Sequence, residues 1–279
     1  MRNAIIVGLV LAISATAWAD WRPGDDHKMH WPQLPDFQGW DVNATNPKIL
    51  ADDWRCSQSG DVTDVHFWGS WQGNLVGEIE NIHLSIHKDI PAAGPNDFSR
   101  PGDLLGEWDI SPTDTRVTIV RMPTSPQGWY DPNTGVWTPN DHTLWYQYNI
   151  VGLGAAGEDL VFQNVGEIYW LDITFDVLPM EIPGPGPNDP PEIIQPLWGW
   201  KTADMLAYPD GTPTQANHFQ DDAVWADLGG GAALVWNPLE DQEGVSFDLA
   251  FVITPEPATM TVMGLGAIAV LVRRRKRRS

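Results

Sequence analysis

The chain has 279 residues with 16 tryptophans, a single cysteine and a formal net charge of −21 at pH 7. Residues 20–254 alone hold nine Lys and Arg against 36 Asp and Glu, a formal charge of about −27. A surface this acidic repels phosphate backbones, which excludes nucleic acid as a partner. One cysteine excludes an internal disulfide, and we expect Cys56 to be a small buried side chain rather than a nucleophile.

The N-terminus has the three parts of a secretory signal peptide. Arg2 supplies positive charge, residues 5–13 form an apolar run too short for a permanent membrane span, and Ala17 and Ala19 frame a cleavage site. We therefore predict that the export machinery recognises residues 1–19 and that they are removed, so that Asp20 begins the mature protein.

Residues 20–47 are rich in Pro, Trp, Asp and His and predict an irregular arm whose aromatic side chains pack onto the following domain. After the arm, short runs of alternating apolar and polar residues predict strands. In one of these runs His83, Ser85 and His87 alternate with apolar residues and should share a face. Strands are expected at residues 48–54, 62–71, 78–87, 115–121, 143–151, 167–177, 197–200, 223–225, 232–236 and 245–253.

Segments rich in Pro, Gly, Asn and Asp separate these strands, the longest of them at residues 91–101, 125–140 and 182–191. No stretch between the two ends carries a long period of 3.6 residues, so the body is predicted to be all-β. About ten strands with long irregular loops favour a single β-sandwich of jelly-roll type over residues 48–254.

The C-terminus places three elements in order, which are the motif Pro255-Glu256-Pro257, an apolar segment over residues 260–272, and the basic cluster Arg273, Arg274, Arg275, Lys276, Arg277 and Arg278. The prolines end the fold, the apolar segment is expected to form a helix held in the inner membrane, and the basic cluster should stay in the cytoplasm. This order resembles the PEP-CTERM sorting signal, over residues 255–279.

The resemblance implies that an exosortase-type enzyme recognises and removes the tail. The protein would then be exported, anchored in the membrane at first, and afterwards found at the cell surface or outside the cell. A plain single-span anchor is the alternative.

Several segments of the body resemble an uncharacterised family of exported bacterial proteins that often carry PEP-CTERM tails. The resemblance implies a domain of unknown function and supplies no catalytic residues. The segments that carry it are residues 51–56, 62–71, 84–87, 99–102, 163–172, 199–202, 221–225 and 248–254.

Adjacent acidic residues beside predicted strands raise the question of a structural calcium ion. Calcium takes carboxylate and carbonyl oxygens, and loops of β-sandwiches supply both. No EF-hand spacing is present, so solvated carboxylates are the simpler interpretation, and no other cofactor is expected. The candidate ligands are Asp52, Asp53, Asp221 and Asp222.

Aromatic side chains in the 125–140 segment could stack on the rings of an extracellular polysaccharide. Trp129, Tyr130 and Trp137 are the candidates, and in this Pro/Gly-rich segment Trp129 and Trp137 are expected to be exposed. Large rings in a sandwich are more often part of the core.

The sequence contains no nucleophile elbow, Walker loop or zinc-protease motif. Paired carboxylates suitable for a polysaccharide hydrolase arise easily by chance among so many acidic residues. We therefore expect a non-enzymatic surface or matrix protein with a structural or interaction role. A carbohydrate-binding module is the main alternative, and a hydrolase is a more distant one.

Overall fold

The computed structural model describes residues 20–29, 31–94, 97–154, 157–158, 160–184, 186, 189–204, 223–230 and 234–254. These residues form strands and two short 3-10 helices, η1 (Gln72–Asn74) and η2 (Leu228–Gly230), with no α-helix among them. The all-β prediction is confirmed. No helix in these residues is long and apolar enough to cross a membrane.

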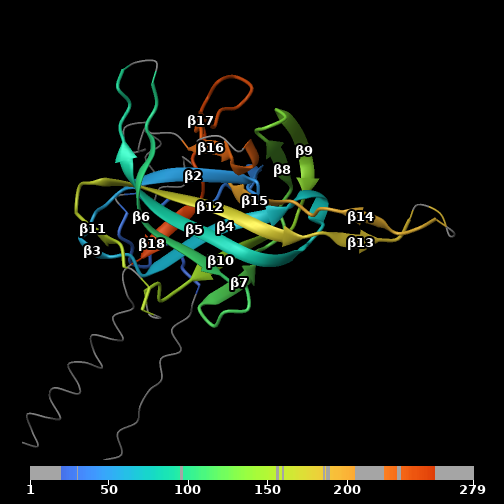
Figure 1. Cartoon of the computed structure of the whole chain (residues 1–279), viewed down its shortest axis with the longest axis horizontal. Coiled ribbons are helices and arrows are strands. Elements are labelled where there is room, and N and C mark those ends of the chain that lie inside the picture. Colours follow the sequence, from blue (N-terminus) through green and yellow to red (C-terminus); the bar gives the residue numbers. More distant parts are fainter. Residues whose placement is uncertain are drawn as a thin grey trace, which may run out of the picture.

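Two large sheets make up the body (Figure 1). The eight-stranded sheet runs in the order β7 (Val117–Arg121), β10 (Trp145–Ile150), β4 (Asp64–Trp71), β15 (Trp198–Lys201), β1 (Trp40–Asn43), β8 (Gln127–Asp131) and β9 (Val136–His142), and β18 (Phe251–Thr254) also pairs with β4. The six-stranded sheet runs in the order β17 (Asn237–Pro238), β16 (Val224–Asp227), β2 (Lys48–Arg55), β12 (Ile168–Leu178), β5 (Glu78–Ile90) and β6 (Arg100–Ile110).

The two sheets pack face to face as a sandwich, with aromatic side chains between them. Phe67 and Trp198 come from the eight-stranded sheet and Phe175 from the six-stranded sheet, and all three are fully buried. Along β12 the residues alternate between the core and the outer face, as the period of two predicted. Aromatic packing therefore helps to hold the two sheets together.

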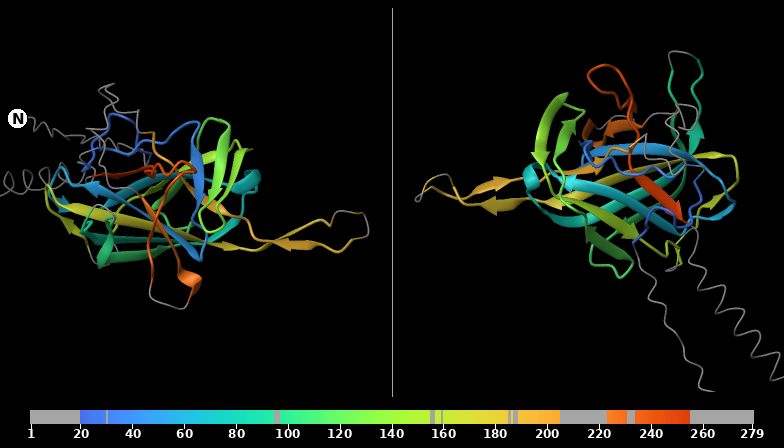
Figure 2. Two further views of the ribbon diagram at one scale, coloured as in Figure 1. Left: turned by 90° about the horizontal axis from the view of Figure 1, so that it is seen from above. Right: turned by 180° about the vertical axis from the view of Figure 1, so that it is seen from behind.

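Two smaller strand pairs lie outside these sheets. β3 (Gly60–Asp61) pairs with β11 (Phe162–Gln163), and β13 (Met180–Ile182) pairs with β14 (Glu192–Ile194). The second pair forms a hairpin that projects well away from the body (Figure 2). The Pro/Gly-rich stretch 182–191, predicted to be a long surface loop, connects the two strands of this hairpin.

The N-terminal arm packs its aromatic side chains as predicted. The Trp21 ring lies edge-on to Trp68 with centroids 6.2 Å apart, and Gln147 Nε2 donates a 2.8 Å hydrogen bond to the Trp21 carbonyl. The expectation of irregular structure up to residue 47 is wrong at β1, which is a strand within the eight-stranded sheet. This strand is four residues long, too short for alternation to reveal, and both partner strands lie far along the chain.

Other strand predictions also need correction. Residues 125–140 were expected to form a loop but make up most of the β8–β9 hairpin, because strand pairing and ring packing outweigh the turn-forming residues. A strand was also expected at residues 232–236. Residues 234–236, the part of this segment that the structure describes, do not form a strand, and the short strand β17 begins at residue 237.

Candidate functional site

Three adjacent strands of the eight-stranded sheet bring a lysine, an aspartate and a glutamine together. Asp41 on β1 lies opposite Lys201 on β15, and the neighbouring pair, Val42 and Trp200, belongs to the core. Successive side chains of a strand point to opposite faces, so Asp41 and Lys201 lie on the outer face of the sheet. Gln127 begins β8, the strand on the other side of β1.

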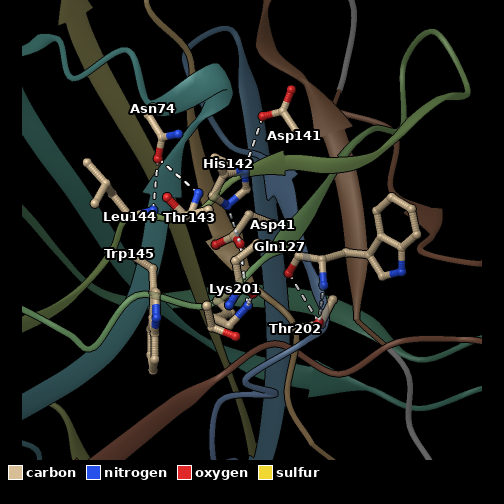
Figure 3. Close-up of polar contacts among 12 residues, drawn as sticks. Asp41, Asn74, Gln127, Asp141, His142, Thr143, Leu144, Trp145, Lys201 and Thr202 are labelled. Carbon is tan, nitrogen blue, oxygen red and sulfur yellow. Dashed lines mark hydrogen bonds and ion pairs between the residues drawn. The ribbon is translucent and has the colours of Figure 1, made fainter.

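These three residues, with His142 and Asp141, form a continuous polar network that we call the Lys201 cluster (Figure 3). The Lys201 ammonium donates a hydrogen bond to Gln127 Oε1, and Nζ lies 3.4 Å from Asp41 Oδ2. His142 Nε2 lies 3.0 Å from the same Asp41 oxygen, and His142 Nδ1 lies 3.1 Å from Asp141 Oδ2. The side chains of Lys201, Asp41 and His142 have no exposed surface.

Aromatic side chains cover this cluster. Lys201 Nζ lies 5.7 Å from the centre of the Trp145 ring, and the Phe37 ring packs edge-on against Trp145 with centroids 5.5 Å apart. The Phe37 carbonyl accepts a 2.7 Å hydrogen bond from Gln127 Nε2. The arm therefore closes the cluster, although Phe37 itself remains 56% exposed.

Burial and charge act in opposite directions on the two charged groups. Burial by itself raises the pKa of Asp41, but the positive charge of Lys201 and the hydrogen bond to His142 outweigh it, so the pKa lies below its usual range. Burial lowers the pKa of Lys201, and the attraction of Asp41 only partly opposes this effect. An amine with a lowered pKa is closer to its neutral, nucleophilic form.

Contacts around the cluster fix the chain on either side of it (Figure 3). Asn74 Oδ1 accepts hydrogen bonds from the backbone amides of residues 143–144 at 2.9 and 2.8 Å, which holds the connection between β9 and β10. Thr202 Oγ1 accepts a 3.0 Å hydrogen bond from the Trp40 amide and donates a 3.1 Å bond to its carbonyl. These bonds hold β1 beside Lys201.

A second polar cluster lies on the outer face of the six-stranded sheet. Ser85 and His87 share that face of β5, as predicted, and both contact Asp172 on β12. His87 Nε2 lies 2.8 Å from Ser85 Oγ and 2.9 Å from Asp172 Oδ2, while Nδ1 lies 3.0 Å from the Gly102 carbonyl oxygen. In a catalytic triad the carboxylate and the serine meet different ring nitrogens. Here both meet the same nitrogen, so these residues are not arranged as a hydrolytic triad.

An open groove of about 530 Å³ lies where β5, β6, β11 and β12 approach one another. Phe162, 57% exposed, supplies an aromatic face in it. Tyr169 donates a 2.7 Å hydrogen bond from its hydroxyl to Glu167 Oε2 and accepts one of 2.8 Å from the Asn164 amide. The lining residues are Lys88, Asp89, Leu105, Phe162, Asn164, Gly166, Glu167, Ile168 and Tyr169.

Comparison with known families identifies both parts of the chain. Residues 29–254 match the model of the Domain of unknown function (DUF7901), and residues 254–277 match the PEP-CTERM protein-sorting motif. The chain belongs to the DUF7901 family. No curated protein and no solved structure matches it. The sorting motif makes it an exported protein handled by an exosortase-type sorting enzyme.

The DUF7901 domain places the three predicted sugar-binding aromatics in the β8–β9 hairpin. The expectation that Trp129 is exposed is wrong, since it is only 1% exposed and packs over Gly199 and beside His142. Tyr130 is also buried and stacks on the half-buried Trp137 with centroids 3.8 Å apart. The rings pack on one another and on the sheet, because hairpin pairing places them there.

Two of the four candidate calcium ligands, Asp52 and Asp53, lie in the part of the domain that the structure describes, and both are buried. Asp52 Oδ1 accepts a 2.8 Å hydrogen bond from the Asp53 amide, and Oδ2 accepts one of 2.6 Å from the Leu249 amide. The other two candidates, residues 221 and 222, lie outside the described residues. Within the described part of the DUF7901 domain, no group of three or more His, Cys, Asp or Glu is arranged to hold a metal ion. The calcium site stays a prediction.

The predicted signal-cleavage residues Ala17 and Ala19, the motif 255–257 and the basic cluster 273–278 lie outside the described residues. Cys56 is buried, as expected, and burial raises the pKa of its thiol.

The sequence alone did not predict the Lys201 cluster of the DUF7901 domain. One feature of the sequence indicated a buried lysine, since Lys201 directly follows the apolar run Trp198–Trp200 in a predicted strand.

Proposed function

We propose that this exported protein works at the cell surface or in the extracellular matrix as a non-enzymatic structural or interaction protein. The observation that carries the proposal is the enclosure of its reactive side chains. A catalytic group must touch its substrate, yet Lys201, Asp41 and His142 have no exposed side-chain surface. Both ring nitrogens of His87 already contact groups of the protein, Nδ1 the Gly102 carbonyl and Nε2 the Asp172 carboxylate.

Location is tested by protease treatment of intact cells that express either the full chain or a variant with Pro255, Glu256 and Pro257 all changed to Ala. The full chain should be cleaved from outside, and the variant should remain in the membrane fraction, protected from the protease. Equal protection of both proteins would contradict a surface location. Hydrolysis of any polysaccharide by the purified protein would contradict the non-enzymatic role.

A second candidate function is carbohydrate binding, and the groove around Phe162 favours it. An exposed ring can stack on a sugar face, and the polar lining of Asn164, Glu167 and Lys88 offers donors and acceptors for hydroxyl groups. The groove supports this role better than Trp129, because that ring is buried.

Hydrolysis in the same groove is less well supported. A glycosidase needs one carboxyl group with a raised pKa to act as an acid. The hydrogen bond from Tyr169 instead lowers the pKa of Glu167.

Carbohydrate binding is tested on a glycan array with the purified protein and two variants. Phe162→Ala should weaken binding about five- to thirtyfold, because the ring contributes roughly 1–2 kcal/mol. Ile193→Ala is the matched control, since Ile193 is 73% exposed on the projecting hairpin, away from the groove. Binding that is absent, or unchanged in Phe162→Ala, would contradict a sugar site in this groove.

A further inference from the structure

We propose that Lys201 and Gln127 become joined by an intramolecular isopeptide bond, formed inside the folded domain with Asp41 as the proton carrier. The bond would link β15 to β8 across β1, at the centre of the Lys201 cluster. It is a covalent modification of the chain by its own side chains, and it does not depend on the proposed function.

Enclosure is the first observation. Lys201 is one of only nine cationic residues between positions 20 and 254, and its side chain has no exposed surface. Burying a charged amine costs free energy, and a protein with an apolar residue of similar size in such a position is often at least as stable. Gln127 and Asp41 are also buried, so water does not compete with the amine for the carboxamide.

Proximity is the second observation. Lys201 Nζ contacts Gln127 Oε1 directly, and the carbonyl carbon is one bond beyond that oxygen. The other end of the carboxamide is held by the Phe37 carbonyl, which accepts a 2.7 Å hydrogen bond from Gln127 Nε2. The amine and the carboxamide are thus both held in place, which raises the effective concentration of one at the other.

The reaction needs no co-reactant. Asp41, 3.4 Å from Nζ, accepts a proton from the Lys201 ammonium, and the neutral amine attacks Cδ of Gln127. As the tetrahedral intermediate collapses, the Cδ–Nε2 bond breaks and the leaving nitrogen takes two protons, one that Asp41 returns and a second that Nζ gives up on becoming an amide nitrogen. A new Nζ–Cδ amide forms, and the leaving group departs as ammonium, which carries the positive charge that Lys201 held at the start. Asp41 ends as a carboxylate, and nothing is oxidised or reduced.

The carboxamide is the better electrophile of the two acyl groups near the amine. Asp41 carries a negative charge that deactivates its carbonyl carbon, whereas the Gln127 carboxamide is neutral. Nε2 of Gln127 points to the Phe37 carbonyl, and Phe37 is 56% exposed. The leaving ammonia therefore departs on the side where the arm meets solvent.

The test is denaturing intact-mass spectrometry of the purified chain, followed by sequencing of its peptides. The expected result is a mass lower than the sequence mass by one ammonia, with a branched peptide that joins Lys201 to Gln127. Lys201→Met and Gln127→Leu should each restore the full mass expected for the variant. Asp41→Asn should slow formation of the bond, followed as mass loss against time after refolding.

Two control variants separate this bond from other losses of ammonia. Lys48→Met changes another buried lysine, which pairs with Asp227, and Gln147→Leu changes another buried glutamine of the same sheet. Both should still lose the ammonia. The wild-type chain answers the question even where a variant does not fold. An unmodified mass with Lys201 and Gln127 in separate linear peptides would overturn the proposal, and so would loss of water with a link from Lys201 to Asp41.

Discussion

Phe175 and Trp198 stack face to face across the interface between the two sheets, with ring centroids 3.7 Å apart and ring planes 2° from parallel. Phe175 comes from β12 and Trp198 from β15, so the contact joins the six-stranded sheet to the eight-stranded sheet. Phe67 and Tyr148 surround the pair edge-on. The stack is a central contact of the sandwich core.

Phe175→Ala should therefore lower the free energy of unfolding by about 3–5 kcal/mol, because a buried ring is lost and a cavity remains. Urea denaturation followed by tryptophan fluorescence measures the effect. Ile193→Ala, on the projecting hairpin, is the exposed control and should change stability by less than about 0.5 kcal/mol. A loss in Phe175→Ala no larger than in the control would contradict the assigned core.

Gly69 allows Trp198 to approach its strand closely. A Cβ atom at this position would lie 2.4 Å from Cζ2 of Trp198 and 2.5 Å from the Gly199 carbonyl oxygen, which is backbone and cannot rotate away. Gly69→Ala should cost about 1–3 kcal/mol or more of stability, measured by denaturation. Gly94→Ala is the matched control, since nothing lies within 4 Å of its added Cβ. Equal stability of the two variants would show that this packing is not tight.

His66 should make the domain less stable in mild acid. Burial lowers its pKa from 6.5 to about 4 in the folded state, although Asn149 contacts its ring. The unfolded chain therefore binds more protons between these values, so this contribution to stability is present above pH 6.5 and is lost as the pH falls toward 4.

The expected loss attributable to His66 is about 2 kcal/mol between roughly pH 7 and pH 5. Denaturation of wild type and His66→Gln at both pH values measures it. The variant should depend less on pH over this interval. The same slope in both proteins would rule out His66 as the source.

His87 should have the opposite pH dependence. Burial acts to lower its pKa, but the hydrogen bond and negative charge of Asp172 outweigh burial, so the pKa is raised above 6.5. The stability that protonated His87 contributes is therefore complete below pH 6.5, and it is lost as the pH rises through the raised pKa of His87 in the folded state. His87→Gln should cost more stability near about pH 6 than near about pH 9, measured by urea midpoints. An equal cost at both would contradict a charged His87–Asp172 pair.

Much of the fold could be predicted from local pattern. In β5 and β12 apolar residues alternate over many positions, so a period of two is visible without knowledge of any partner strand. The same pattern placed Ser85 and His87 on one face. The hairpin at Trp129 and Trp137 was hidden, because Pro and Gly residues in its sequence indicate turns more strongly than its short alternation indicates strands.

The sequence by itself determined the C-terminal sorting motif, the acidic character and the all-β class, because each depends on composition or on neighbours along the chain. Only the tertiary structure decided which side chains meet. Lys201 contacts Gln127, 74 positions away, and Asp41, 160 positions away, because β15, β1 and β8 are adjacent in the sheet. It also decided that Trp129 is buried. Such contacts follow from strand order, which local periodicity does not specify.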